Sequence, residues 1–362
     1  MRRLKWIIAL AAILALATTA VAQDITVEEI QTAIEAKGGQ WSAAYTDAWE
    51  KHHDYGWYPA NLTLPELTGN ERYFRPLGLD DYPAHLDWRD FEGENWVTRV
   101  KNQMSCGSCW SFATIGPIEA HIQIQEDWPE MGVNLSEQHL ISCCTGVGCH
   151  GCNGGFTTTS YDFAETIGLV DEDCFAYKAN DTVPCDDKCS DWNDRVYKID
   201  NWAIIGEGAL DAVLPDPEDV IEGLMFGPLG TSLAIYQDFY SYESGIYDHM
   251  LGIPTGFHAV TIVGYDVEEG YWICKNSWGS SFGEDGYFRI KWGAAFVGAF
   301  TILPEYTAQG LKPPESDDDE ADDDTGDDDT GDDDDDDDDN DTAGAAPDQG
   351  DDDDDNDSGG CS

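Results

Sequence analysis

The sequence predicts an α+β fold with two subdomains, one helical and one rich in strands, within residues 81–307. The first half of this region carries apolar residues at helical spacing, from Cys109 to Ile124 and from Thr158 to Ile167. The second half carries short apolar runs bounded by glycine and aspartate, which are typical of strands: Leu229–Ile235, Ala259–Tyr265, Gly270–Lys275 and Gly286–Lys291. Because helical and strand patterns occupy separate halves, they indicate two subdomains.

The first 22 residues have the pattern of a secretory signal peptide. Three basic residues within the first five precede the apolar run Trp6–Ala17, and Ala20-Val21-Ala22 fits small-residue cleavage. The run is shorter than the roughly 20 residues that span a bilayer, which disfavours a membrane anchor. No later segment has the composition of a membrane span. We therefore expect a secreted protein.

The C-terminal residues 308–362 form a low-complexity acidic tail. From Glu315 onward there are 27 acidic residues and no lysine or arginine. Such a segment repels itself and buries little apolar surface, so we expect it to be disordered. Its aspartate runs lack the fixed ligand spacing of a calcium loop, so cation binding there would be weak. The formal net charge of −55 disfavours a nucleic-acid partner.

Residues 23–80 form a separate zone before the predicted core. Apolar residues at helical spacing predict a helix over residues 25–36, which Gly38-Gly39 ends. An aromatic stretch that we expect to be irregular follows, from Gln40 to about Asp81. These aromatic side chains must pack against another part of the chain. The zone is either an N-terminal subdomain or a pro-segment that lies across the remainder of the molecule.

The segment with the most specific chemistry is Gln103-Met104-Ser105-Cys106-Gly107-Ser108-Cys109-Trp110-Ser111-Phe112. A thiol is strongly nucleophilic only as a thiolate, so the fold must stabilise a negative charge on sulfur. Cys109 precedes a predicted helix, whose free N–H groups and positive end would face the sulfur. Cys109 is therefore the candidate nucleophile, and it requires a histidine as its acid–base partner.

His258 is the best candidate among eight histidines. It begins an apolar strand pattern, where its ring would be held rigidly. Asn276 follows eighteen residues later, which allows the two side chains to meet across a strand, a turn and a returning strand. An amide would orient the imidazole without adding charge, and Trp278 would shield their hydrogen bond. The alternative is that His258 is a buried histidine with a structural hydrogen bond.

Three segments together resemble the papain (C1) family: QMSCGSCWSF, the strand HAVTIVGY, and KNSWGSSFGEDGYFRI. The resemblance covers roughly Tyr82 to Tyr306. It implies a papain-like fold, in which an active-site cleft separates a helical domain carrying Cys109 from a strand-rich domain carrying His258 and Asn276. The implied activity is peptide-bond hydrolysis through an acyl-enzyme, on peptide or protein substrates, without cofactor or metal.

The resemblance also implies roles for four further residues. Gln103 and the backbone N–H of Cys109 would form the oxyanion hole. Gly154 and Gly155 would form a ledge that pairs with the substrate backbone, and Trp278 would also line the substrate site. Without the neighbouring segments, the two glycines would indicate only a turn.

The resemblance favours the pro-segment interpretation of residues 23–80, because Leu86-Asp87-Trp88-Arg89 is similar to the mature N-terminus of the family. The pro-peptide would act as an intramolecular inhibitor. It lacks the long helical pattern of the cathepsin L group and is similar to the cathepsin B type. However, no long insertion with paired histidines precedes Cys185 as in the occluding loop of cathepsin B, so endopeptidase activity is expected.

Most of the eleven cysteines lie between Cys106 and Cys189, and export favours disulfides over metal ligands. The resemblance implies four disulfides: Cys106–Cys152, Cys143–Cys185, Cys144–Cys149 and Cys174–Cys189. Cys274 is expected to be a buried thiol. Cys361 is left over on the tail, where it offers a means of attachment to a surface.

The sequence leaves two alternative functions open. The first is a catalytically inactive papain-fold protein that binds other molecules, although Cys109, His258, Asn276 and Gln103 are all present. The second is a zinc module, because Cys106-x-x-Cys109 and Cys149-x-x-Cys152 form two C-x-x-C pairs. Export and the downstream histidine and asparagine segments argue against zinc.

Overall fold

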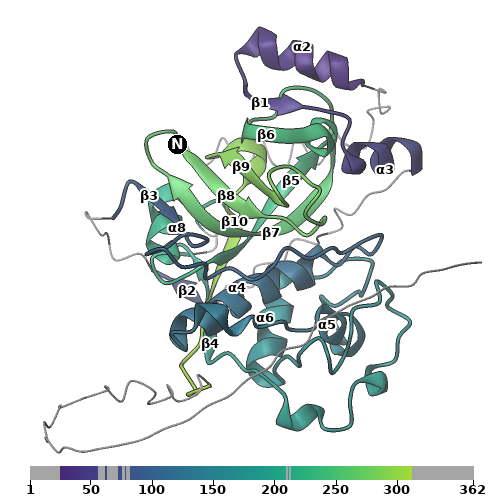
Figure 1. Ribbon diagram of the computed structural model, residues 1–362, viewed down its shortest axis with the longest axis vertical. Helices are drawn as coiled ribbons and strands as arrows, with labels where there is room; N and C mark the ends of the chain where they lie inside the picture. Colours follow the sequence, from purple (N-terminus) through teal and green to yellow (C-terminus); the bar gives the residue numbers. More distant parts are fainter. Residues whose placement is uncertain are drawn as a thin grey trace, which may run out of the picture. The chain divides into compact units, whose positions relative to one another are not determined.

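The computed structural model has a mixed α+β fold, as the sequence predicts (Figure 1). It describes residues 25–55, 62, 72–75, 78, 82–208, 211 and 213–311. The predicted signal peptide and the tail beyond residue 311 lie outside the described residues. Residues 308–311, which we expected to belong to the disordered tail, are described. Backbone N–H groups of Gln309 and Leu311 donate to the carboxylate of Glu126, at 2.6 and 2.8 Å.

One sheet runs through the described part of the chain, in the order β1-β6-β9-β8-β7-β5-β10-β4-β2, with β3 paired to β7. Its strands are β1 Gln40–Ala43, β2 Tyr73–Phe74, β3 His85–Asp87, β4 Asn201–Ile205, β5 Leu229–Tyr236, β6 Tyr242–Tyr247, β7 Pro254–Asp266, β8 Tyr271–Lys275, β9 Tyr287–Lys291 and β10 Ala299–Glu305. Both end strands of this order, β1 and β2, precede residue 80. The N-terminal zone therefore covers edges that would otherwise expose unpaired backbone groups.

The helices fall into two groups (Figure 1). They are α2 Val27–Lys37, α3 Asp47–Tyr55, α4 Cys109–Gln125, α5 Glu137–Cys143, α6 Thr157–Thr166 and α8 Pro217–Leu224. The central helix α4 is buried along nearly its whole length and packs with α5 and α6 in one apolar cluster. A second apolar cluster fills the strand-rich half and includes the buried face of α2. Along the described ranges, no helix is both long and apolar enough for a bilayer crossing.

The stretch after residue 40 is more regular than we predicted, because it contains β1 and α3. Trp41 in β1 is buried against Tyr242 and Tyr247, with ring centroids 6.3 and 5.1 Å apart. Strand β1 pairs antiparallel with β6, and Trp41 lies opposite Gly245. A Cβ on Gly245 would stand 2.3 Å from the carbonyl oxygen of Gln40, so glycine is required for this close approach. The aromatic residues of this zone thus dock it onto the strand-rich half.

Candidate active site

Cys109 is the first residue of α4, as the sequence predicts. It is buried and takes part in no disulfide. The backbone N–H groups of Ser111 and Phe112 bond to the carbonyl oxygen of Ser108, so the helix is hydrogen-bonded from its first turn. The Cys106–Cys152 disulfide and the bond from Gly107 N–H to Cys152 O, 3.0 Å long, fix the preceding loop. The helix end therefore offers positive partial charge to a thiolate.

His258 and Asn276 meet across the β7–β8 hairpin. Thr261 in β7 pairs with Lys275 in β8, so Asn276, which follows β8 directly, lies across from the part of β7 that holds His258. The His258 Nε2 to Asn276 Oδ1 distance is 2.8 Å, and both side chains are buried. Asn276 Oδ1 also accepts the N–H of Ser277 at 2.8 Å, which fixes the amide orientation.

The two ring nitrogens of His258 have different surroundings. Because Asn276 Oδ1 can only accept, Nε2 carries the proton of the neutral ring. The opposite nitrogen, Nδ1, is buried and has no hydrogen-bond partner within the described ranges. Burial lowers the pKa of His258 to about 4, although the bond to Asn276 opposes this shift. A thiolate beside Nδ1 would favour the imidazolium and raise that pKa again.

Trp278 covers the His258–Asn276 pair. Its ring centroid lies 4.9 Å from that of His258. The same ring stacks on Tyr240, with centroids 5.6 Å apart, and meets Phe282 edge-on at 4.9 Å. These aromatic neighbours keep water from the buried amide–imidazole bond, which strengthens it.

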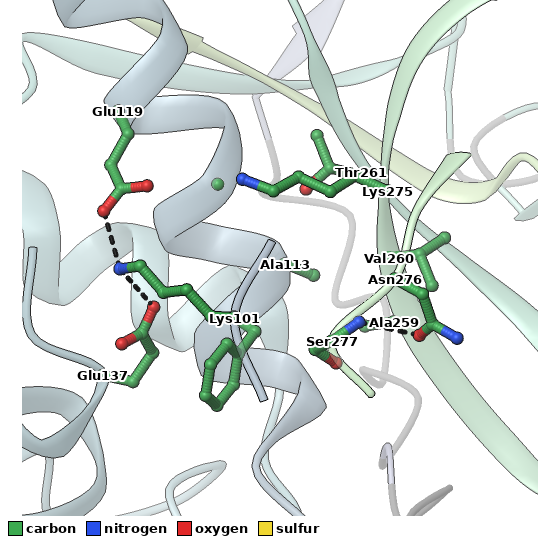
Figure 2. A pocket seen from close by; sticks show the side chains of 12 residues that line it. Lys101, Ala113, Glu119, Glu137, Ala259, Val260, Thr261, Lys275, Asn276 and Ser277 are labelled. Atoms are coloured by element: carbon green, nitrogen blue, oxygen red, sulfur yellow. Dashed lines mark hydrogen bonds and ion pairs between the residues drawn. The ribbon is translucent and has the colours of Figure 1, made fainter. Parts of the chain in front are cut away.

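Helix α4 packs directly on strand β7. A Cβ on Gly116 would lie 2.7 Å from Thr261 Oγ1, so the helix touches the strand here. Ala113 and Ala259 line the same small cavity one turn earlier (Figure 2). Residue numbers at the contacts therefore rise in the same direction along the helix and the strand. From Gly116 back to Cys109 is about 10 Å of helix, and from Thr261 back to His258 is about 10 Å of strand.

Gln103 is locked between the two halves of the molecule. Its backbone N–H donates to Ser277 O at 2.8 Å, and its Oε1 accepts the hydroxyl of Ser277 at 2.6 Å. Its Nε2 donates to Cys106 O at 2.9 Å, and Tyr177 donates its hydroxyl to Gln103 O at 2.7 Å. Two of these bonds hold the side-chain amide and two hold the backbone of the residue, so the amide is preorganised, which an oxyanion-hole donor requires.

The two candidate ledge glycines are both required by the local structure. Gly154 has a φ of 106°, which an L side chain rarely adopts. A Cβ on Gly155 would stand 2.5 Å from the ring of Trp110, whose Nε1 donates to Gly151 O at 3.1 Å. Packing against Trp110 thus explains Gly155, and its contact with substrate remains a prediction.

A buried group of charges beside the site was not predicted from the sequence. Lys101 Nζ lies 2.7 Å from Glu119 Oε1 and 2.9 Å from Glu137 Oε1 (Figure 2). Lys275 Nζ donates to Thr98 Oγ1 at 3.0 Å. Thr98 in turn donates to Glu119. In this charge cluster (Thr98, Lys101, Glu119, Glu137, Lys275), every member except Thr98 borders a cavity of about 20 Å³ between α4 and the β7–β8 hairpin.

Burial and neighbouring charge shift the pKa values within this cluster. Burial lowers the pKa of Lys275 to about 8 and raises that of Glu137 to about 7. Burial would also lower the pKa of Lys101, but Glu119 and Glu137 outweigh it and raise that pKa. Lys101 lies two residues before Gln103, and Lys275 lies directly before Asn276. Their positions beside predicted site residues were the available signal.

The structure contains the four disulfides that the resemblance implies, and Cys274 is a buried thiol. Three cysteines of the two C-x-x-C pairs (Cys106, Cys149 and Cys152) are disulfide-bonded. A sulfur in a disulfide is not a thiolate ligand, which argues against the zinc alternative.

Comparison with known proteins adds to this geometry. Residues 82–302 match the family described as papain family cysteine protease. Pro-cathepsin H of Mus musculus is 32% identical over 228 residues, which are 61% of this chain and 64% of that protein. This chain thus spans slightly less than two thirds of the length of that pro-cathepsin H. Cathepsin B-like CP1 of Giardia intestinalis is 37% identical over 222 residues, which are 59% of this chain and 69% of that protein.

Solved proenzyme structures share the fold. Procathepsin L 3 of the Tenebrio molitor larval midgut has a TM-score of 0.63 at 24% identity, over 77% of this chain and 87% of that chain. ProCathepsin B S9 from Trypanosoma congolense has a TM-score of 0.63 at 23% identity, over 78% and 99%. The family match extends over more than half of the sequence, and this chain belongs to the papain family of cysteine proteases.

Proposed function

We propose that this protein is a secreted cysteine endopeptidase synthesised as a zymogen, with Cys109, His258 and Asn276 as its catalytic residues. The observation that carries the proposal is the buried His258–Asn276 bond of 2.8 Å, which leaves His258 Nδ1 without a described partner. A histidine that is oriented on one nitrogen and unpaired on the other suits acid–base catalysis. Cys109, at the positive end of α4, supplies the nucleophile.

The proposed reaction proceeds in two halves. The Cys109 thiolate attacks the carbonyl carbon, and Gln103 with the Cys109 backbone N–H stabilises the oxyanion. The C–N bond then breaks, and His258 Nδ1 gives its proton to the departing amine, leaving a thioester. In the second half, Nδ1 takes a proton from water as the water attacks the thioester carbon. The C–S bond then breaks, which releases the acid product and restores the thiolate and the imidazolium. Gly154, Gly155 and Trp278 border the substrate.

The N-terminal zone is proposed to inhibit the enzyme. Its strands β1 and β2 occupy the two ends of the sheet order. Between them in the sequence, the backbone N–H of Leu62 donates to the carbonyl oxygen of Phe257 at 3.0 Å, directly before His258. Leu62 is buried in the same apolar cluster as Cys109. These contacts support a pro-peptide that passes beside the catalytic residues.

The proposal also covers the type of cleavage. The chain has no long insertion with paired histidines before Cys185, so nothing of that kind limits cleavage to the substrate C-terminus. We therefore favour an endopeptidase related to the cathepsin B-type branch. Disulfides that involve eight cysteines suit the secreted location.

The test uses a form that begins near Leu79 and a fluorogenic peptide amide. Replacing Cys109 by alanine should lower kcat about 10⁴-fold or more, because the nucleophile is lost. The control Cys274→Ala removes the other described thiol and should retain the activity. An epoxide reagent should modify Cys109 and block cleavage, and the full-length form should be inactive. Unchanged cleavage in the Cys109→Ala variant would exclude the assignment and leave the inactive binding protein as the alternative.

A further inference from the structure

Met104 is an exposed apolar side chain in a conformation that methionine rarely adopts. Its φ is 53°, in the left-handed region that favours glycine. Its side chain belongs to a residue that is 59% exposed, so packing into the protein core does not explain a methionine here. A bulky apolar residue held in this conformation beside a catalytic group invites a functional explanation.

Contacts on both sides impose the conformation of the turn that contains Met104. On one side, Gly279 N–H donates to Lys101 O at 3.1 Å, and Asn102 forms a bridge with Trp278. On the other side, Cys106 is disulfide-bonded to Cys152. Met104 N–H donates to Asn102 Oδ1 at 2.8 Å within the turn. Because its flanks are fixed, the turn presents the methionine side chain outward at a defined place.

The position of the turn relates Met104 to one end of the substrate groove. The glycine ledge is joined to the turn through the Gly107–Asn153 bridge. Trp278 is joined to the opposite end of the turn, through Asn102. A substrate that extends from Gly154 past Cys109 toward Trp278 would pass the methionine only after the scissile bond. Met104 immediately follows Gln103, so it belongs to the same turn as the proposed oxyanion-hole residue.

We propose that Met104 is a specificity-determining residue, which contacts the first substrate residue on the leaving-group side and favours an apolar side chain there. This inference rests on the proposed peptidase function and on the proposed ledge. The thioether is flexible and polarisable, so it adapts to differently shaped apolar partners. Because Met104 is exposed, its contact with the substrate side chain should affect specificity less than an enclosed pocket would.

The test compares three substrates with the processed enzyme and its Met104→Gly and Met104→Asn variants. Two internally quenched peptides differ only in the residue after the scissile bond, which is leucine in one and serine in the other. The third substrate is a peptidyl coumarin amide, which has no amino acid there. Glycine and asparagine both accept the left-handed backbone, so the turn can be kept, and thermal melting checks the fold.

We expect the leucine-to-serine ratio of kcat/KM to fall about fivefold in both variants, because an apolar contact is lost. The matched control is Val147→Ser, which removes an apolar side chain from a residue that is 87% exposed elsewhere, and it should leave the ratio unchanged. An unchanged ratio in both Met104 variants would overturn the proposal, as would equal losses on all three substrates. If the unaltered protein cleaves none of them, the peptidase function itself fails.

Discussion

At the scale of single residues, His258 depends on Asn276 for its orientation. The amide oxygen receives both the imidazole N–H and the backbone N–H of Ser277, each at 2.8 Å. An amide holds the ring without adding a charge, so the positive imidazolium remains available to pair with a thiolate. A carboxylate in this place would compete for that charge.

Replacing Asn276 by alanine should therefore lower kcat/KM about 100-fold, because the ring loses its fixed orientation. It should also lower the free energy of unfolding by about 1–3 kcal/mol, since a buried N–H of His258 loses its partner. Steady-state kinetics and urea unfolding would measure these effects. Asn276→Gln keeps the amide but displaces it, and should retain more activity than alanine. Full activity in the alanine variant would contradict the orienting role.

The residue scale is also where the sequence was most informative. Cys109, His258 and Asn276 lie in three segments whose order resembles one family, and the His258–Asn276 hydrogen bond follows from the hairpin spacing. The charge cluster was not predictable in the same way. Lys101, Glu119, Glu137 and Lys275 are distant in sequence, and charged residues are usually exposed. Only the three-dimensional packing of α4 against α5 and the β7–β8 hairpin brings them together.

At the scale of elements, the charge cluster connects the helix that carries Cys109 with the strand that precedes Asn276. Thr98 receives a bond from Lys275 and donates one to Glu119, so the chain of contacts runs from β8 to α4. Glu119 Oε1 also accepts the N–H of Leu135 at 2.8 Å. Because buried charges tolerate little displacement, the cluster fixes the distance between α4 and β8.

Replacing Lys101 by methionine should lower the free energy of unfolding by about 3–5 kcal/mol, because Glu119 and Glu137 would remain buried without their cation. The measurement is urea unfolding of the Cys109→Ala precursor, which avoids self-cleavage. The double variant Lys101→Met, Glu137→Gln should recover part of the loss, since one buried negative charge is removed. If the double variant is as unstable as the sum of both single variants, the pairing explanation fails.

Element prediction succeeded where patterns were long and periodic. The four expected strands match β5, β7, β8 and β9 within a few residues, although β7 begins earlier, at Pro254. The strand β1 and the helix α3 were missed. Strand β1 has only four residues and is stabilised by pairing with β6, about 200 residues away, so local patterns contain no sign of it.

At the scale of the whole molecule, the N-terminal zone contacts the strand-rich half at β6 and also at the loop that follows β6. Trp41 Nε1 donates to Asp248 O at 3.0 Å, and Lys37 donates to Met250 O. The loop is itself fixed by buried Asp238, which accepts bonds from Tyr247, from the N–H groups of Met250 and Leu251, and from His249. The loop that the N-terminal zone contacts is therefore held in place by buried hydrogen bonds of its own.

Replacing Trp41 by alanine should speed removal of the pro-segment about tenfold or more, because a large buried anchor is lost. Processing of the purified precursor can be followed by gel electrophoresis after addition of a trace of active enzyme. Tyr45→Ala is the control, because Tyr45 lies on the same segment but is 60% exposed, and it should have little effect. Equal processing rates for the Trp41→Ala variant and the unaltered precursor would contradict this account of docking.

Buried neutral histidines make the stability of the molecule depend on pH. Burial lowers the pKa values of His121 and His139 to about 4, whereas the unfolded value is about 6.5. The unfolded chain thus binds more protons between these values, and stability falls as pH decreases from about 6.5 to 4.

Replacing His121 by glutamine should make this fall shallower by up to about 3 kcal/mol, because one titrating ring is removed. The amide can still donate to Pro228 O, which His121 Nε2 approaches at 3.1 Å. Urea unfolding of the Cys109→Ala precursor at pH 7 and pH 4.5 would provide the comparison. An unchanged difference between the two pH values would show that His121 does not contribute.

The pairing of Cys109 with His258 is tested most directly by the pH dependence of alkylation. The rate at which iodoacetamide modifies Cys109 is measured in the processed protein and in its His258→Ala variant. If a thiolate faces an imidazolium, rapid alkylation should persist to about pH 5, far below the ordinary thiol pKa of about 8.5. Loss of His258 should shift the profile toward that ordinary value. An ordinary thiol profile in the unaltered protein, or identical profiles for both proteins, would contradict the account.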